Sequence, residues 1–335
     1  MKKRALGSTG LAVTELGFGG APLGNLFRPL PDATAHTTLA AAKSAGFGYF
    51  DTAPFYGFGL SERRLGDALR GGDFVLSSKV GRVLDPVTGP VSESQVRHGY
   101  ATPMPFEPVF DYSYDAVMRS FEESLQRLGL ARIDILFIHD IGRMTHGEEN
   151  AFHMAELTSG GGLKALEELR AAGRIAGFGM GVNEVEACLD VMEHARLDVI
   201  LLAGRYTLLE QTPLDGLFPR CQAAGTAIVI GGPFNSGILV AGSKSGATFN
   251  YEAAPPAVVE KVAALEAVCE SHGVALPAAA LQFPLAHPLV ASVIPGLDAP
   301  ERVAQAAAWL QAPIPAALWQ DLKAKNLLRQ DAPTP

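Results

Sequence analysis

The stretch "YDAVMRSFEESLQRLGLARIDILFIHD" (114–140) decides the fold, because it contains one complete unit of helix and strand. Over 114–130, the apolar residues Val117, Phe121, Leu125 and Leu128 recur at helical spacing and share one face of an amphipathic helix. The residues that follow, 131–140, form an apolar run typical of a buried strand. A helix followed by a buried strand is the repeating unit of folds with a parallel sheet.

The same pattern continues in both directions and gives eight units. Eight units with right-handed crossovers in a chain of 335 residues predict a (β/α)8 barrel of class α/β, with a doubly wound sheet as the alternative. No linker or change of composition divides the chain, so we expect a single domain over 1–335. The expected strands are 15–21, 47–53, 73–81, 131–140, one starting near 175, 198–203, 226–232 and 289–296, and the expected helices are 32–45, 61–70, 114–130, 163–172, 184–195, 214–224, 255–272, 277–287 and 300–310.

Three segments lie outside the regular repeat. The runs "RALG" and "LAVTELG" flank the turn residues Ser8, Thr9 and Gly10, which predicts a β-hairpin before the first barrel strand. A further helix is expected over 313–327 as a C-terminal extension. The connection 82–112 is long and rich in aromatic residues, so we interpret it as a lid over a ligand, with an irregular loop as the alternative.

Composition excludes several classes of protein. A formal charge of −8 and a pI of about 5.5 disfavour nucleic acids and anionic membranes as partners. No apolar run approaches the roughly 20 residues of a membrane-spanning helix, and "MKKRALGSTG" lacks the apolar segment of a signal peptide. Cys188, Cys221 and Cys269 are widely spaced, so we expect no disulfide framework, no metal site and a cytoplasmic location.

Ionisable residues end three consecutive expected strands. Asp51, Lys79 and His139 each follow an apolar run, and Tyr56 lies in the loop after Asp51. These strand ends meet at the mouth of a barrel, where active sites lie. Asp51 can keep a buried Lys79 charged, and an ammonium favours the ionised form of a nearby phenol, so Tyr56 is predicted to be a general acid or base. With His139 as a hydrogen-bond donor, such a site suits proton transfer coupled to hydride transfer with a nicotinamide.

The phrases "LGFGGAPLG" (16–24), "FDTAPFYG" (50–57), "SSKVG" (77–81) and "FIHD" (137–140) resemble the aldo-keto reductase superfamily, and the resemblance covers essentially the whole chain. It implies Tyr56 as proton donor or acceptor, Asp51 and Lys79 as its tuning pair, and His139 as the residue that orients substrate. "GLSERRLG" (59–66), "LLAGRYTLLEQ" (201–211) and "GGPFNSGIL" (231–239) are similar to the branch with D-threo-aldose 1-dehydrogenases (L-fucose dehydrogenase among them), L-galactose dehydrogenases and pyridoxal 4-dehydrogenase.

The resemblance also implies a dinucleotide bound across the mouth without a Rossmann motif. Asn183 stands one position beyond the site where relatives bind the nicotinamide amide, and the loop after the seventh strand can cradle a pyrophosphate. Gly231 occupies the place of the aromatic residue that stacks on the nicotinamide in many relatives. The implied cofactor contacts are Gly20, Ala21, Asp51, Asn183, Tyr206, Gly231, Gly232, Pro233, Phe234, Ser236, Gly237, Gly296, Arg302 and Gln305.

The adenosine end of this expected site favours NAD. Relatives that bind NADP have a lysine and an arginine at the positions of Gly296 and Arg302, and an acid, Asp298, lies between these two residues here. Loss of one cation weakens recognition of a 2′-phosphate, so NAD is predicted, with NADP as the alternative because Arg302 is retained.

The resemblance finally implies oxidation of a cyclic hemiacetal to a lactone. The expected substrate is the C1 hydroxyl of an aldose such as L-fucose, D-arabinose or L-galactose, in contact with Phe55, Tyr56 and His139. The alternatives are a pyridoxal 4-dehydrogenase that forms 4-pyridoxolactone, an NADPH-dependent reductase of aldehydes or ketones, and a purely regulatory subunit. A monomer or homodimer is expected.

Overall fold

The computed structural model describes residues 1–92, 95–243, 246, 248–250 and 252–335. Eight parallel strands lie in the order β3-β4-β5-β10-β11-β12-β13-β16, and the two ends of this order meet. The amide of Gly17 donates to the carbonyl of Val293 (2.9 Å), and the amide of Gly19 donates to that of Pro295 (3.0 Å). The predicted (β/α)8 barrel is thus confirmed over the doubly wound sheet. Its strands are β3 (Phe18–Gly19), β4 (Tyr49–Asp51), β5 (Val75–Val80), β10 (Ile135–His139), β11 (Gly177–Val182), β12 (Val199–Ala203), β13 (Ala227–Gly231) and β16 (Val290–Ile294).

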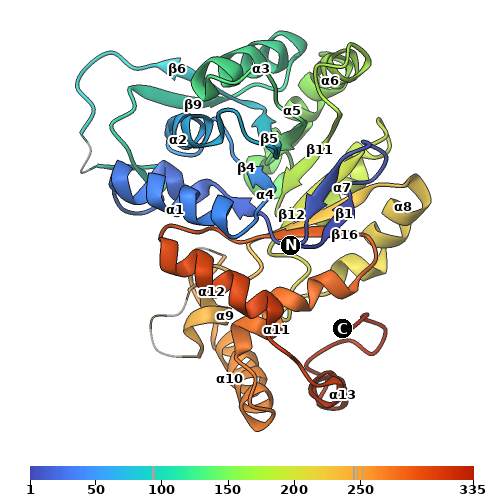
Figure 1. Cartoon of the computed structure of the whole chain (residues 1–335). Helices are drawn as coiled ribbons and strands as arrows, with labels where there is room; N and C mark the ends of the chain where they lie inside the picture. Colours follow the sequence, from blue (N-terminus) through green and yellow to red (C-terminus); the bar gives the residue numbers. More distant parts are fainter. Residues whose placement is uncertain (93–94, 244–245, 247, 251) are drawn as a thin grey trace.

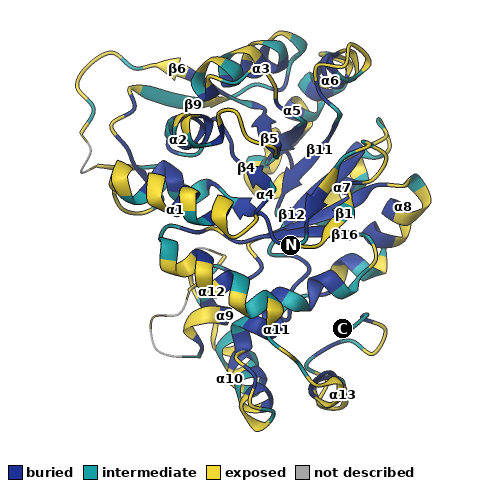
Figure 2. Ribbon diagram, in the orientation of Figure 1, coloured by how far each residue is buried: buried dark blue, intermediate teal, exposed yellow. Residues whose placement is uncertain are grey.

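Helices cover the outside of the barrel, with α2, α3 and α6 on one side and α11 and α12 on another (Figure 1). The barrel strands are buried on both faces, whereas most of these helices have one buried and one exposed face (Figure 2). This is the pattern that the amphipathic spacing of 114–130 predicts. The helices are α1 (Asp32–Ser44), α2 (Leu60–Leu69), α3 (Tyr114–Leu128), α6 (Gly162–Ala171), α7 (Val185–Val191), α8 (Leu217–Ala224), α10 (Pro256–Ser271), α11 (Leu276–Gln282), α12 (Pro300–Gln311) and α13 (Ala316–Ala324).

The N-terminal hairpin closes the end of the barrel opposite the mouth. Strands β1 (Lys3–Ala5) and β2 (Ala12–Thr14) pair antiparallel, which confirms the predicted hairpin. Leu6 and Val13 are buried in one apolar cluster with inward-facing barrel residues such as Phe137 and Val229. The lumen is therefore a packed core and leaves the mouth as the place for chemistry.

The described residues of the connection 82–112 contain two pairs of antiparallel strands. Strand β6 (Arg82–Pro86) pairs with β9 (Phe106–Phe110), and β7 (Val96–Arg97) pairs with β8 (Tyr100–Ala101). The ring of Tyr100 packs against the ring of Phe55 at 5.3 Å, so this segment contacts the loop after β4. Residues 93–94 of the expected lid lie outside the described residues.

Several short elements were not expected from the sequence, because they are too short for a periodic apolar pattern. The expected helix at 184–195 is also shorter, as α7, and the one at 214–224 is divided at Gly216. The expected helix at 277–287 is divided into α11 and η4 (Pro284–Ala286). The unexpected elements are η1 (Ala21–Gly24), α4 (Arg143–His146), η2 (Gly147–Glu149), α5 (Asn150–Leu157), η3 (Thr212–Asp215), α9 (Ile238–Ala241), β14 (Thr248–Phe249) and β15 (Glu252–Ala253).

In the part of the chain that the structure describes, no helix combines the length and the apolar character needed to cross a membrane. Within the same residues, no three side chains of His, Cys, Asp or Glu gather as they would around a metal ion. The three cysteines are free and buried.

Candidate active site

Glycines fix the loop that carries Tyr56. Gly24, from the loop after β3, packs backbone to backbone on this loop, and a Cβ on Gly24 would lie 2.4 Å from the carbonyl carbon of Tyr56. Gly57 has a positive φ of 66°, and its own added Cβ would lie 2.3 Å from the carbonyl oxygen of Gly24. Any larger residue at either position would push the two loops apart, so the glycines determine where the phenol lies.

A buried ion pair lies at the ends of β4 and β5. The Lys79 ammonium donates to the Asp51 carboxylate (2.6 Å) and to the Thr52 carbonyl (2.8 Å), and the Ser77 hydroxyl donates to the other carboxylate oxygen of Asp51 (2.7 Å). Burial raises the pKa of Asp51 and lowers the pKa of Lys79, and the attraction between the two charges opposes both shifts. Each residue is therefore the group that keeps the other ionised.

The four residues predicted from the strand ends do come together. The Lys79 nitrogen lies 4.6 Å from the centroid of the Tyr56 ring. The His139 ring meets the Tyr56 ring edge to face, with centroids 5.8 Å apart. A phenol, a charge pair and an imidazole thus face one another at the mouth of the barrel.

His139 is held as a neutral side chain. Burial first, and then the charges of Arg82 and Lys79, lower its pKa well below the ordinary value. Its Nδ1 has no hydrogen-bond partner among the described residues, and its Nε2 lies 3.4 Å from Asp140. The Tyr112 hydroxyl donates to the His139 carbonyl (2.7 Å) and fixes the backbone there. A neutral imidazole can donate a hydrogen bond to substrate at neutral pH.

Sequence reasoning missed Arg82, Asp140 and Tyr112. The Arg82 guanidinium pairs with Asp140 and lies over the rings of Phe55 (3.9 Å) and Phe110 (4.5 Å). Arg82 and Asp140 come directly after the strands that end near Lys79 and His139, so the rule that selected those two residues also applies to them. The Phe55 ring lies 6.0 Å from the His139 ring, beside the catalytic candidates.

The loop after β13 is a tight turn with left-handed residues. Asn235, Ser236 and Gly237 follow one another with positive φ values of 45°, 57° and 93°. The amides of Asn235 and Gly237 donate to the carbonyls of Gly232 and Phe234 (both 3.0 Å), so the turn is closed by its own backbone. The Phe234 ring packs on Trp309 of α12 (5.8 Å), which joins this loop to the helix that carries the exposed residues Arg302 and Gln305.

The remaining cofactor candidates are distributed around the same rim. Gly20 is buried, and its amide donates to the Asp51 carbonyl (2.8 Å), while Ala21 is half-buried in η1. Gly231 ends β13, with Gly232 exposed and Pro233 buried behind it, and Gly296 is exposed after β16. Asn183 follows β11, and its amide donates to the carbonyl of Ala203 (3.3 Å).

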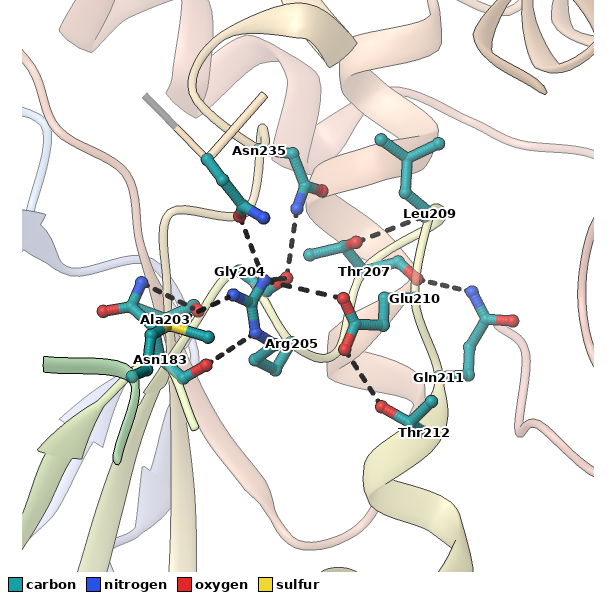
Figure 3. A network of polar contacts seen from close by, with 12 residues as sticks. Asn183, Ala203, Gly204, Arg205, Thr207, Leu209, Glu210, Gln211, Thr212 and Asn235 are labelled. Carbon is teal, nitrogen blue, oxygen red and sulfur yellow. Dashed lines mark hydrogen bonds and ion pairs between the residues drawn. The ribbon is translucent and has the colours of Figure 1, made fainter. Parts of the chain in front are cut away.

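The Tyr206 side chain lies away from the mouth, so its position gives no support to the predicted cofactor contact. Its ring is fully buried and packs on Phe218 (4.8 Å) and Phe283 (5.2 Å). Two residues of irregular backbone after β12 turn its side chain toward the outer helices. The preceding residue, Arg205, contacts Asn183 in its place (Figure 3).

Asp298 engages both arginines near the expected adenosine position. The Arg28 guanidinium donates to one carboxylate oxygen (2.7 Å), and the Arg302 Nε lies 3.2 Å from the other. A cation in contact with an acid attracts a phosphate less strongly than a free one.

A closed (β/α)8 barrel with a phenol, a lysine–aspartate pair and a histidine at its mouth defines an enzyme scaffold. The model of the aldo/keto reductase family matches residues 15–327, and the chain belongs to this family of oxidoreductases, which use NAD(H) or NADP(H).

Two curated relatives are similar over nearly the whole chain. Pyridoxal 4-dehydrogenase of Microbacterium luteolum is 46% identical, and the alignment covers 98% of each of the two chains. D-threo-aldose 1-dehydrogenase of a Pseudomonas species is 39% identical over 99% of this chain and 98% of its own. Among solved structures, an aldo-keto reductase from Bacillus halodurans in its holo form aligns with a TM-score of 0.74 at 25% identity, covering 98% of this chain and 97% of its own.

Proposed function

We propose that this protein oxidises a cyclic hemiacetal to a lactone and transfers the hydride to NAD. The observation that carries the proposal is the buried Lys79–Asp51 pair in contact with the Tyr56 ring, with the His139 ring facing it. The two curated relatives support the same class by their names, which describe dehydrogenases.

A bound nicotinamide supplies the hydride acceptor. Asn183 is the proposed contact of its amide, with Gly20, Ala21 and Asp51 lining the approach. The loop after β13 is the proposed position of the pyrophosphate, with Gly231, Gly232, Pro233, Phe234, Ser236 and Gly237 as proposed contacts. Gly296, Arg302 and Gln305 are the proposed adenosine contacts.

Tyr56 is the proposed proton acceptor. As the hydride leaves the anomeric carbon, the hydroxyl on that carbon loses its proton to the phenolate, and the carbon–oxygen bond becomes the lactone carbonyl. The Lys79 charge, 4.6 Å from the ring, stabilises the phenolate. Asp51 keeps Lys79 charged against the effect of burial, which lowers the lysine pKa.

His139 is the proposed orienting residue. Because its pKa is well below the ordinary value, it is a neutral donor at working pH and adds no charge to the oxidised nicotinamide. A hydrogen bond from it to the reacting oxygen places that oxygen between the imidazole and the phenol.

The aromatic side chains favour pyridoxal as the first substrate to test. The Phe55 ring lies 6.0 Å from the His139 ring and packs edge to face on Tyr100 (5.3 Å), so it is the proposed aromatic contact of a planar pyridine ring. Pyridoxal forms an internal hemiacetal, so the same chemistry applies to it and to an aldose. L-Fucose, D-arabinose and L-galactose follow as candidates.

The contacts of Asp298 with Arg28 and Arg302 support NAD over NADP, because a 2′-phosphate would have to compete with this carboxylate. We further propose a monomer or homodimer that acts in the cytoplasm on this small molecule.

The test is a panel assay of pyridoxal, L-fucose, D-arabinose and L-galactose, each with NAD and with NADP, followed by the absorbance of the reduced cofactor. We expect turnover of at least one hemiacetal and a higher kcat/KM with NAD. Failure of all four substrates would overturn the proposal. Faster reduction of open-chain aldehydes by NADPH would support the reductase alternative instead.

A further inference from the structure

Arg205 links several of the loops at the rim of the barrel (Figure 3). Its side chain is only 9% exposed, and it is the second residue after β12. Its Nε donates to the carbonyl of Asn183 (2.6 Å), and one terminal nitrogen donates to the side-chain oxygen of Asn250 (3.1 Å). The residue after β11, the segment after β12 and the segment after β13 are therefore joined through one guanidinium.

The same guanidinium and a neighbouring amide fix the backbone of Gly204. Its carbonyl accepts from Arg205 (3.4 Å) and from the side-chain nitrogen of Asn235 (3.0 Å). Asn235 is 3% exposed and is the first of the three left-handed residues in the proposed phosphate loop. Arg205 is thus bonded directly to the Asn183 backbone and indirectly to the loop that would bind the pyrophosphate.

Burying an arginine is costly unless its charge and donors are satisfied, and an ion pair with Glu210 (3.5 Å) offsets part of that cost here. The polar partners of Arg205 are loop residues at the mouth. A lysine could not replace it, because only the planar fork presents donors in several fixed directions. The burial of the guanidinium and its hydrogen bonds to loops at the mouth together indicate that Arg205 organises these loops.

We propose that Arg205 is a positioning residue that holds Asn183 in place for the nicotinamide end of the dinucleotide. This rests on the cofactor site proposed above. The Asn183 side chain also donates to the Ala203 carbonyl (3.3 Å), so both its backbone and its amide are oriented from the end of β12. Loss of the guanidinium releases the backbone and weakens the nicotinamide contact, while the adenosine contacts are left in place.

The test compares binding of NAD with binding of ADP-ribose, which lacks the nicotinamide, by calorimetry on the full chain. For Arg205→Met we expect affinity for NAD to fall about tenfold, as for loss of one charge-assisted hydrogen bond, and affinity for ADP-ribose to change by less than about twofold. Arg205→Lys should not restore NAD binding. In an Asn183→Ala background, Arg205→Met should cause little further loss, because the two residues act through one contact.

The matched control is Arg170→Met. Arg170 pairs with Asp198 (2.7 Å) at the end of the barrel that the hairpin closes, far from the mouth in the fold. Its loss should leave the ratio of the two affinities unchanged.

Equal losses of NAD and ADP-ribose binding in Arg205→Met would overturn the proposal, and so would unchanged NAD binding or additive effects with Asn183→Ala. If Arg205→Met does not fold, Arg205→Lys alone and combined with Asn183→Ala give the same comparison. A wild-type chain that binds no dinucleotide would overturn the proposed function and this inference with it. Normal wild-type binding with unaffected Arg205 variants would overturn this inference alone.

Discussion

On each of its two faces, strand β5 presents side chains that bind one buried carboxylate. We call the residues on these faces the inner set and the outer set. On the inner face, the Ser77 hydroxyl and the Lys79 ammonium both donate to Asp51 (2.7 and 2.6 Å). Asp51 is 2% exposed. This set lies at the mouth, where Lys79 also contacts the Tyr56 ring.

On the outer face, the Ser78 hydroxyl donates to Glu62 of α2 (2.8 Å), and Arg127 of α3 donates to the other oxygen of Glu62 (2.5 Å). Glu62 is fully buried. The outer set joins two helices to the strand. The two sets have the same chemistry, because neighbouring residues of a strand point to opposite faces. The surroundings of the two sets differ. The inner set lies beside the phenol of Tyr56 at the mouth, whereas the outer set lies among packed helices.

The largest expected effect is that of Tyr56→Phe. Removing the hydroxyl takes away the proton acceptor, so kcat for formation of the reduced cofactor should fall about 10³-fold. Dinucleotide binding, measured by calorimetry, should change by less than about threefold because the ring remains. Rates close to wild type would remove Tyr56 from the mechanism.

The two cations should matter about equally for stability. Lys79→Met and Arg127→Met each leave a buried carboxylate without its partner, so each should lower the free energy of unfolding by about 3–5 kcal/mol. Urea unfolding followed by circular dichroism measures both. Wild-type stability in either variant would contradict the claim that this cation stabilises the buried carboxylate.

Replacing the two serines compares the same two faces of β5 with smaller expected losses of stability. Ser77→Ala and Ser78→Ala each remove one hydrogen bond to a buried carboxylate, at a cost of about 1–3 kcal/mol in the free energy of unfolding. Only Ser77→Ala should also alter the pH profile of kcat, since the Ser77 hydrogen bond lowers the pKa of Asp51. A changed profile in Ser78→Ala would contradict the division between the two faces.

The smallest effect should appear on acidification. Burial lowers the pKa of His139 well below its ordinary value and that of His146 to about 4. The unfolded chain therefore binds protons from about pH 6.5 downward while the folded chain does not, and the free energy of unfolding falls as pH decreases through this window. Urea midpoints at pH 7 and pH 5 should differ less in His146→Gln than in wild type. The same difference in both would exclude His146 as a contributor.

The barrel could be predicted from the sequence because its repeat is long and regular. The inner set of residues could be predicted as well, since Asp51, Lys79 and His139 interrupt apolar runs at strand ends. The outer set could not, because Glu62 and Arg127 occupy positions on helices where charged residues are common on exposed faces. Nothing in their spacing shows that one meets Ser78 in the core.

The loops at the mouth show the same limit. Tyr206 was predicted as a cofactor contact, but the backbone after β12 turns its ring toward Phe218, and Arg205 is the residue that contacts Asn183. The direction of a side chain in an irregular loop depends on a few dihedral angles that no periodicity records. Arg82 and Tyr112 reach the site from the paired strands β6 and β9 and the turn after them, which depend on long-range pairing.

The most direct test of the account is the single-turnover rate of cofactor reduction in Lys79→Met and Arg127→Met, measured by stopped-flow absorbance at saturating dinucleotide and at conditions where both are folded. The account predicts a rate at least about 100-fold below wild type for Lys79→Met, because the phenolate loses its stabilising charge, and a rate within about threefold of wild type for Arg127→Met. Equal rates in the two variants would contradict the claim that the inner face of β5 serves the chemistry and the outer face the fold.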